Sequence, residues 1–219
     1  AAYRFLGSRW ADLDPLKRTE RPKIPELEPA FYDLSESDMD ITFSAANTYF
    51  GAEQMTLRQI MQALRETYCG TVGAEIMHCT DPTEKRWWQE RLERVRSKPT
   101  FNADEKNHIL DRLTAAEGLE RYLHTKFVGQ KRFSLEGSES FIASMDELVQ
   151  RAGEKGVQEI VIGMAHRGRL NVLVNTLGKM PADLFAEFDH TAKEDLPSGD
   201  VKYHQGFSSD SSTPGGPVH

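Results

Sequence analysis

Cysteine is scarce in this sequence, and long apolar runs are absent. The 219 residues include only two cysteines, Cys69 and Cys79, too few for a scaffold held by disulfides. We therefore expect free thiols and a reducing compartment. The longest uninterrupted apolar run, residues 160–165, falls far short of the roughly 18 residues that a membrane span needs. The sequence therefore predicts a soluble protein that does not bind membranes. We find no charged and apolar leader ahead of a cleavage site, which also favours a reducing compartment.

An excess of positive charge is also lacking. Lysine and arginine number 27 against 34 aspartates and glutamates, which gives a formal net charge of -7. Proteins that bind phosphate backbones generally need the opposite balance, so we expect no nucleic-acid partner.

The signatures of several enzyme classes are missing too. No GxxxxGKS or GxxxxGKT loop and no GxGxxG turn occur, so neither nucleotide hydrolysis nor Rossmann-type dinucleotide binding is indicated. No nucleophilic serine elbow and no HExxH motif occur either. Cys69, His78 and Cys79 are potential zinc ligands without a fourth at a usual spacing, so we expect no metal ligands among these residues.

Residues 1–100 predict a small all-helical region. Four prolines between residues 15 and 29 indicate an extended surface strap. Thr56 is suited to cap a helix whose apolar residues recur at helical spacing as far as Gly70. A second helix is expected from Asp81 to about residue 96.

Residues 101–219 predict an α/β arrangement. Helical patterns cover 102–127, as two helices or one bent helix, and 140–156. A β-branched run at 159–164 follows, which is typical of a strand buried in a parallel sheet. The remaining expected elements are helices at 169–178 and 181–188 and a second strand at 201–204. Strand, helices and strand in this order favour a parallel sheet.

Two histidines fall at the predicted ends of these strands. His166 follows the first strand and His204 ends the second, and the carboxyl ends of parallel strands meet at one edge of a sheet. We therefore expect both imidazoles to face one ligand and to donate hydrogen bonds to it. Arg167 and Arg169 make the turn at His166 suitable for phosphate or carboxylate. Alternatively, both arginines pair with surface acids while His166 caps the helix.

Four longer motifs lie in order along the chain. They are residues 114–123 (TAAEGLERYL), 131–137 (KRFSLEG), 163–173 (GMAHRGRLNVL) and 199–204 (GDVKYH), with shorter ones at 2–5, 12–16, 67–70, 73–75 and 84–87. Taken alone, 131–137 is typical of a structural turn. Taken together, the motifs closely resemble the E1 component of the 2-oxoglutarate dehydrogenase complex.

The resemblance implies a fold and a function. Residues 101–219 would be the incomplete first part of a transketolase-like, thiamine diphosphate-binding domain with a parallel sheet. The enzyme would decarboxylate 2-oxoglutarate in the tricarboxylic acid cycle and pass the succinyl group to the lipoyl group of the E2 component. Family chains are several times longer, so we expect this piece alone to be inactive. The segment that holds the diphosphate through Mg²⁺ would lie outside these residues.

The resemblance also implies roles for single residues and for partners. His166 and His204 would be the catalytic histidines that engage substrate. Arg132 and Phe133 would line the cofactor pocket, and Phe133 and Ser208 would contact substrate. The partners would be the lipoyl-bearing E2 component, the E3 component and a second copy of the enzyme in a homodimer. The location would be the bacterial cytoplasm, or the mitochondrial matrix in a eukaryote.

Two alternatives stay open on the sequence. A related E1 component acting on another 2-oxoacid, such as 2-oxoadipate, would carry similar motifs. Residues 1–100 could instead form a docking module without catalytic function, since arginines and glutamates between residues 86 and 96 make one helix face strongly charged. A solvated face explains the same charges.

Overall fold

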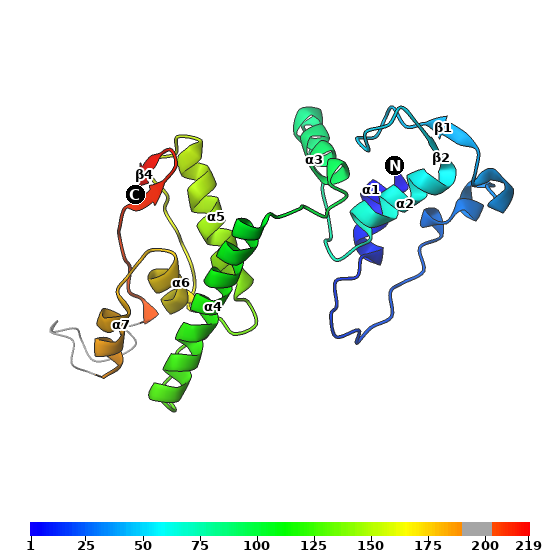
Figure 1. Cartoon of the computed structure of the whole chain (residues 1–219). Helices are drawn as coiled ribbons and strands as arrows, with labels where there is room; N and C mark the ends of the chain where they lie inside the picture. Colours follow the sequence, from blue (N-terminus) through cyan, green and yellow to red (C-terminus); the bar gives the residue numbers. More distant parts are fainter. Residues whose placement is uncertain (190–202) are drawn as a thin grey trace. The chain divides into compact units, whose positions relative to one another are not determined.

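The computed structural model describes residues 1–189 and 203–219. It divides the chain into two compact units, Ala1–Thr100 and Phe101–His219 (Figure 1). Each unit contains helices and a small antiparallel sheet of its own. The chain is therefore a mixture of α and β structure. No helix in the described part of the chain is both long and apolar enough to cross a membrane.

Unit 1 combines helices with a short strand pair. Its elements are α1 (Ala2–Leu6), η1 (Gly7–Trp10), η2 (Pro25–Leu27), η3 (Pro29–Tyr32), η4 (Glu36–Asp38), β1 (Thr42–Ser44), β2 (Gln54–Thr56), α2 (Leu57–Tyr68) and α3 (Pro82–Arg94), where η marks a 3-10 turn. Strands β1 and β2 pair antiparallel, with Thr42 opposite Thr56. The expectation of an all-helical region is wrong here, because strands this short give no readable alternation and β1 is exposed throughout.

Helices α2 and α3 confirm the helices predicted over 56–70 and 81–96, with slightly earlier ends. At the start of α2, the backbone N–H of Gln59 donates to Oγ1 of Thr56 and the N–H of Thr56 donates to Oε1 of Gln59. This reciprocal pair satisfies N–H groups that a helix start leaves unpaired. At α3, Oδ1 of Asp81 accepts from the N–H of Thr83 at 2.7 Å.

The proline-rich strap is attached to the core of unit 1 near its end. Residues 16–23 are exposed, whereas Leu27 is buried with Tyr3 and Tyr68. The hydroxyl of Tyr3 donates to the carbonyl of Leu27 at 2.9 Å. Ile24 packs against the same core, and Nη1 of Arg21 donates to the carbonyl of Trp10 at 3.2 Å. Apolar packing and hydrogen bonds therefore hold a segment that has little regular structure.

A buried carboxylate lies at the centre of unit 1. Glu93 is fully buried, and Nε and Nη2 of Arg4 donate to its two oxygens at 2.7 and 2.9 Å. The hydroxyl of Tyr68 and the backbone N–H of Tyr49 donate to the same carboxylate at 2.7 and 3.0 Å. Burial, followed by this bond to Glu93, raises the pKa of Tyr68. Four hydrogen bonds therefore offset the cost of burying the carboxylate.

Unit 2 is built on one long helix. Its elements are α4 (Ala103–Lys126), α5 (Ser140–Glu154), α6 (Arg169–Asn175), α7 (Pro181–Phe188), β3 (Ser211–Thr213) and β4 (Gly216–Val218). Helix α4 is continuous, which decides between the two possibilities for 102–127, and Asn102 and Glu105 cap its start reciprocally. Its buried side chains pack with residues of α6, α7 and the segment at Tyr203.

The run at 159–164, predicted as a buried strand, is extended but belongs to neither sheet. Val161 is 96% exposed. Among the described residues, the backbone of the run pairs with His219, whose C=O accepts from the N–H of Ile160 at 2.7 Å and whose N–H donates to the C=O of Gln158 at 2.8 Å. His219 thus bonds to the residues on either side of Glu159. This is the hydrogen-bond pattern of two parallel strands, formed here at a single residue pair.

The second predicted strand, 201–204, lies partly outside the described residues, and its last two residues, Tyr203 and His204, lie in a turn. The sheets in the described part of the chain are both antiparallel and two-stranded, with Ser211 opposite Val218 in the β3–β4 pair. A parallel sheet is therefore not seen here. Local β-branched composition predicts extended backbone correctly, but a sheet also needs neighbouring strands.

We expect Arg4→Met to lower the free energy of unfolding of unit 1 by about 3 kcal/mol, because it leaves the carboxylate of Glu93 buried without its cation. The three tryptophans, Trp10, Trp87 and Trp88, all lie in unit 1, so tryptophan fluorescence during urea unfolding reports this unit alone. The exposed Arg9→Met is the matched control. Equal midpoints for both variants would contradict the structural role of the pair.

We expect the two thiols to differ in reactivity. Cys69 is buried, and burial raises its pKa to about 11, so at pH 8 roughly one thiol in a thousand is ionised. Iodoacetamide should therefore modify Cys79, which is partly exposed, and spare Cys69 until the chain unfolds. Mass spectrometry of the folded chain checks this, with Cys79→Ser as the control. The pKa of Cys69 is higher in the folded chain than in the unfolded chain. The free energy of unfolding that Cys69 contributes therefore falls as the pH rises from 9.0 toward about 11.

Candidate active site

Two histidines from distant parts of the chain are in direct contact in unit 2. The Nε2 atoms of His166 and His204 lie 2.7 Å apart, and their ring centroids are separated by 4.8 Å. We call them the histidine pair. A hydrogen bond between two Nε2 atoms requires a proton on one and a lone pair on the other. The structure thus brings together the imidazoles that the sequence analysis expects at one ligand.

An aromatic ring supports the histidine pair. The ring of Phe133 lies 4.9 Å from that of His166 and stands edge-on to Tyr203 at 5.1 Å. Nζ of Lys131 lies 4.6 Å from the centre of the Phe133 ring. Phe133 has a φ of +46°, a backbone conformation that a bulky residue rarely adopts. Such strain persists only where surrounding contacts enforce it, and it often marks a functional site.

The surrounding contacts are made by the turn after His166. The N–H of Gly168 donates to the carbonyl of Phe133 at 2.9 Å, and Nη1 of Arg167 donates to the carbonyl of Ser134 at 3.0 Å. Gly168 has a φ of +72°, and a Cβ there would lie 2.5 Å from Cδ1 of Leu135. Glycine is therefore required at this position for both its backbone angle and its size.

The two arginines of this turn bind backbone carbonyls. Arg167 binds Ser134, and Nη1 of Arg169 donates to the carbonyl of Tyr203 at 3.2 Å. Neither contact is the pairing with surface acids that the alternative interpretation expects. Both arginines therefore connect neighbouring segments. The polar atoms that face each other beside this turn are the two Nε2 atoms of the histidine pair.

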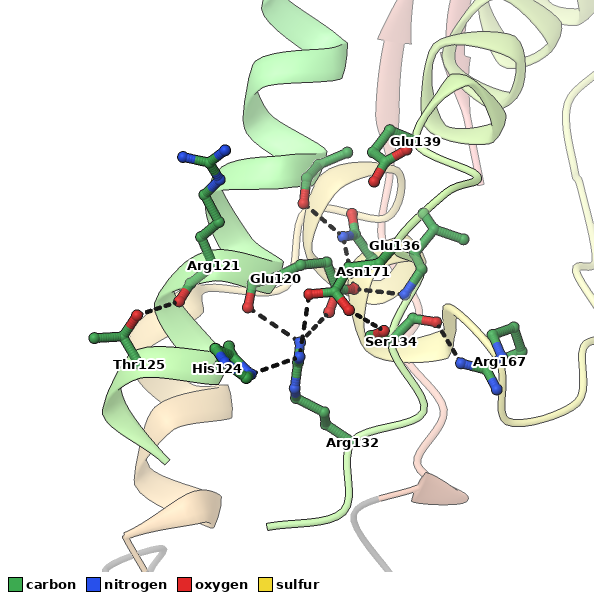
Figure 2. Close-up of polar contacts among 12 residues, drawn as sticks. Glu120, Arg121, His124, Thr125, Arg132, Ser134, Glu136, Glu139, Arg167 and Asn171 are labelled. Atoms are coloured by element: carbon green, nitrogen blue, oxygen red, sulfur yellow. Dashed lines mark hydrogen bonds and ion pairs between the residues drawn. The ribbon is translucent and has the colours of Figure 1, made fainter. Parts of the chain in front are cut away.

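Arg132 is held by acidic and backbone oxygens. Figure 2 shows its guanidinium among Glu120, His124 and Glu136. Nη1 donates to the carboxylate and carbonyl of Glu120 at 2.8 and 3.1 Å, and Nη2 reaches Glu136 at 3.1 Å and Nδ1 of His124 at 3.2 Å. The bond from Arg132, followed by one from Ser134, lowers the pKa of Glu136. Both terminal nitrogens of Arg132 are therefore engaged within the protein.

Glu120 joins the elements that carry the site. It is buried on α4, and its Oε1 accepts from the N–H of Leu135 at 2.9 Å and from Nδ2 of Asn171 at 3.1 Å (Figure 2). Asn171, itself fully buried on α6, also donates to the carbonyl of Ala116 at 2.9 Å. One carboxylate thus connects α4, the loop that carries Phe133 and the helix that follows His166.

The sequence analysis missed Glu120 and Asn171. A signal was present for Glu120, since it lies among Ala116, Leu119 and Leu123 on the apolar face of the helix. A carboxylate on such a face is rarely buried without a partner. The partners themselves lie 12, 15 and 51 residues away, and no local pattern identifies them.

Ser208 is bound to a different histidine. Its hydroxyl lies 2.7 Å from Nε2 of His219. The next residue, Ser209, donates to the carbonyl of Leu177 at 2.6 Å, which fixes the loop against the end of the α6 region. Within residues 1–189 and 203–219, no cluster of three or more histidines, cysteines or carboxylates is arranged to hold a metal ion.

Comparison with known proteins gives strong sequence matches. No family model matches the chain. The chain is 74% identical over all of its 219 residues to the 2-oxoglutarate dehydrogenase E1 component of Cupriavidus necator, and covers 23% of that protein. The proteins of the same name from Azotobacter vinelandii and Haemophilus influenzae are 52% and 47% identical over 100% and 95% of the chain, which covers 23% and 22% of them.

These matches confirm the resemblance that the motifs indicate, and they extend it over the whole chain. The chain spans less than a quarter of the length of these curated relatives. Each of the three is named for 2-oxoglutarate.

We expect Glu120→Gln to loosen the loop that carries Phe133, because a neutral amide binds Arg132 and the N–H of Leu135 more weakly. Hydrogen exchange followed by NMR should show the amides of Leu135 and Gly168 exchanging at least about tenfold faster, as the loss of a charged hydrogen bond predicts. Glu117→Gln, on the same helix, removes only a surface pair with Arg121 and is the control. Unchanged exchange in Glu120→Gln would contradict the role of Glu120.

Proposed function

We propose that this chain contributes the substrate-binding histidines of a 2-oxoglutarate dehydrogenase E1 component. That enzyme would decarboxylate 2-oxoglutarate and pass the succinyl group to the lipoyl group of E2 in the tricarboxylic acid cycle. The observation that carries the proposal is the contact between His166 and His204, which come from different motifs of the resemblance. The high identity to relatives of that name over the whole chain supports it.

The histidine pair suits a dicarboxylate with a keto oxygen. In the free protein the two Nε2 atoms satisfy one another. When an oxygen-rich substrate separates them, each Nε2 can direct a hydrogen bond at a carboxylate or the keto oxygen, provided that it carries a proton. Donors fixed in this way orient the substrate and stabilise negative charge on its oxygens during decarboxylation. His204 is exposed and accessible to a ligand.

Phe133 and Arg132 are the two residues assigned to the thiamine diphosphate pocket of this enzyme class. The contacts of Phe133 leave room for that role, and those of Arg132 do not. Phe133 is half-buried beside His166, where an aromatic ring can contact the apolar part of the cofactor. Arg132 has both terminal nitrogens bound by Glu120, Glu136 and His124, so it offers no free donor there to a diphosphate. We therefore propose that Arg132 holds the loop of Phe133 in place. When bound, the cofactor supplies the nucleophilic carbon and the electron sink for decarboxylation.

The fold and the assembly complete the proposal. We propose that the extended run 159–164 is a strand of a parallel, transketolase-like sheet, supported by its exposed Val161 and by the parallel pattern of its bonds to His219. Mg²⁺ would be held by residues outside this chain. The proposed partners are E2, E3 and a second E1 copy, and the proposed location is the bacterial cytoplasm, since the relatives reported above come from bacteria.

We expect His166→Ala, placed in the intact dehydrogenase, to lower the rate of 2-oxoglutarate decarboxylation by roughly 10²-fold, as for the loss of a positioned donor. His78→Ala replaces an exposed histidine of unit 1 and should leave the rate unchanged. Assays with 2-oxoadipate, run in parallel, identify the preferred acid. A normal rate in His166→Ala would refute the role of this histidine, and faster turnover of 2-oxoadipate would refute the proposed substrate.

A further inference from the structure

A buried lysine binds the residue that follows His204. Lys179 lies between α6 and α7, and its side chain is 10% exposed. Its Nζ donates to Oε1 of Glu187 at 2.8 Å and to Oε1 of Gln205, the residue after His204, at 2.5 Å. An ammonium group only donates hydrogen bonds, so the oxygen of the Gln205 amide is the atom that must face it.

Lys179 is itself held from two helices. Its backbone N–H donates to the carbonyl of Leu173, which is buried on α6, at 2.8 Å. Glu187 lies on α7, and its side chain is 11% exposed. A carboxylate as buried as this one needs its cation close by. The ammonium is therefore fixed by α6 and by α7, and Gln205 binds to a rigid point.

His204 is held on its other side as well. Nη1 of Arg169, the first residue of α6, donates to the carbonyl of Tyr203 at 3.2 Å. The ring of Tyr203 is buried among apolar side chains of α4, α6 and α7. Two cations from one stretch of chain, residues 169–179, thus bind the residues directly before and after His204.

This stretch of chain also begins at the other histidine of the pair. The N–H of Arg169 donates to the carbonyl of His166 at 3.1 Å. Residues 169–179 therefore start beside one ring and hold both neighbours of the other. Since His204 is exposed, packing around its ring contributes little to its position. A shift of about 1 Å would break the 2.7 Å contact between the two Nε2 atoms.

We propose that Lys179 is a positioning residue for the 2-oxoglutarate site. Its ammonium binds Gln205 and thereby keeps the ring of His204 opposite that of its partner histidine. Lys179 acts on the substrate only through these residues. The inference rests on the proposed function, because the position of the histidine pair affects turnover only if the pair engages the substrate.

The test variant removes the ammonium without leaving a buried charge. Lys179→Met alone leaves the carboxylate of Glu187 buried without its cation, which can prevent folding. The double variant, Lys179→Met with Glu187→Met, removes both charges and keeps side chains of similar volume. Lys155→Met replaces an exposed lysine at the end of α5 and is the matched control.

The first measurement follows the histidine ring nitrogens of the whole 219-residue chain by NMR. In the unaltered chain, the contact between His166 and His204 requires one Nε2 with a proton and one without. We expect the double variant to change the spectra of both rings, because the pair separates. The rings of His78 and His108 are internal references, and Lys155→Met should change none of the four. Unchanged rings of the pair in the double variant would overturn the proposal.

The second measurement compares kcat/KM for 2-oxoglutarate in the intact dehydrogenase. We expect the double variant to lower kcat/KM about tenfold or more, because a displaced donor no longer meets the substrate. Added to His204→Ala, it should lower kcat/KM by less than about twofold, because the residue through which Lys179 acts is already gone.

A loss by the same factor in both backgrounds would also overturn the proposal, since it would show a general weakening of the fold. A normal kcat/KM in the double variant alone would do the same. A normal rate in His204→Ala by itself would refute the proposed function and would not bear on the ring spectra. The failures of the two proposals are therefore distinguishable.

Discussion

The carboxylate of Glu120 is buried where helix α4, the loop of residues 131–137 and helix α6 meet. It accepts from Arg132 and the N–H of Leu135 in the loop and from Asn171 on α6, so two donors come from the loop and one from α6. A buried charge is tolerated only when its hydrogen-bonding capacity is met. The need to meet it therefore fixes the distance between the loop and α6, and with it the position of Phe133 beside His166.

The strain at Phe133 follows from this constraint. A positive φ is unfavourable for a bulky residue. It is held by the N–H of Gly168, which donates to the carbonyl of Phe133, and by the N–H of Leu135, which donates to Glu120. The left-handed Gly168 permits the close approach of the turn after His166. The histidine pair is thus positioned by a network whose members are mostly not the residues that a substrate would touch. Arg132 belongs to this network by its contacts in the structure.

Unit 2 also contains an apolar run that is largely exposed in the part of the chain that the structure describes. The run 159–164 has the composition of an interior strand, yet Val161 is almost fully exposed, and within the described residues the run pairs only with His219. The same residue supplies its imidazole to Ser208 and Asp210. The position of this single residue therefore determines both the alignment of the extended run and the hydrogen bonds at Ser208 and Asp210.

Local patterns in the sequence were enough to predict most of the helices and to name candidate site residues. Caps at Thr56, Asp81 and Asn102 predicted where helices begin, because a cap acts within three residues, and the motifs along the chain indicated its relatives and predicted a site at His166 and His204. The β1–β2 pair, the turn at His204 where a strand was predicted, and the partners of Glu120, Arg132 and Ser208 came from the folded structure alone. Those features depend on contacts between residues far apart in the chain, and such contacts leave no periodic trace in the sequence.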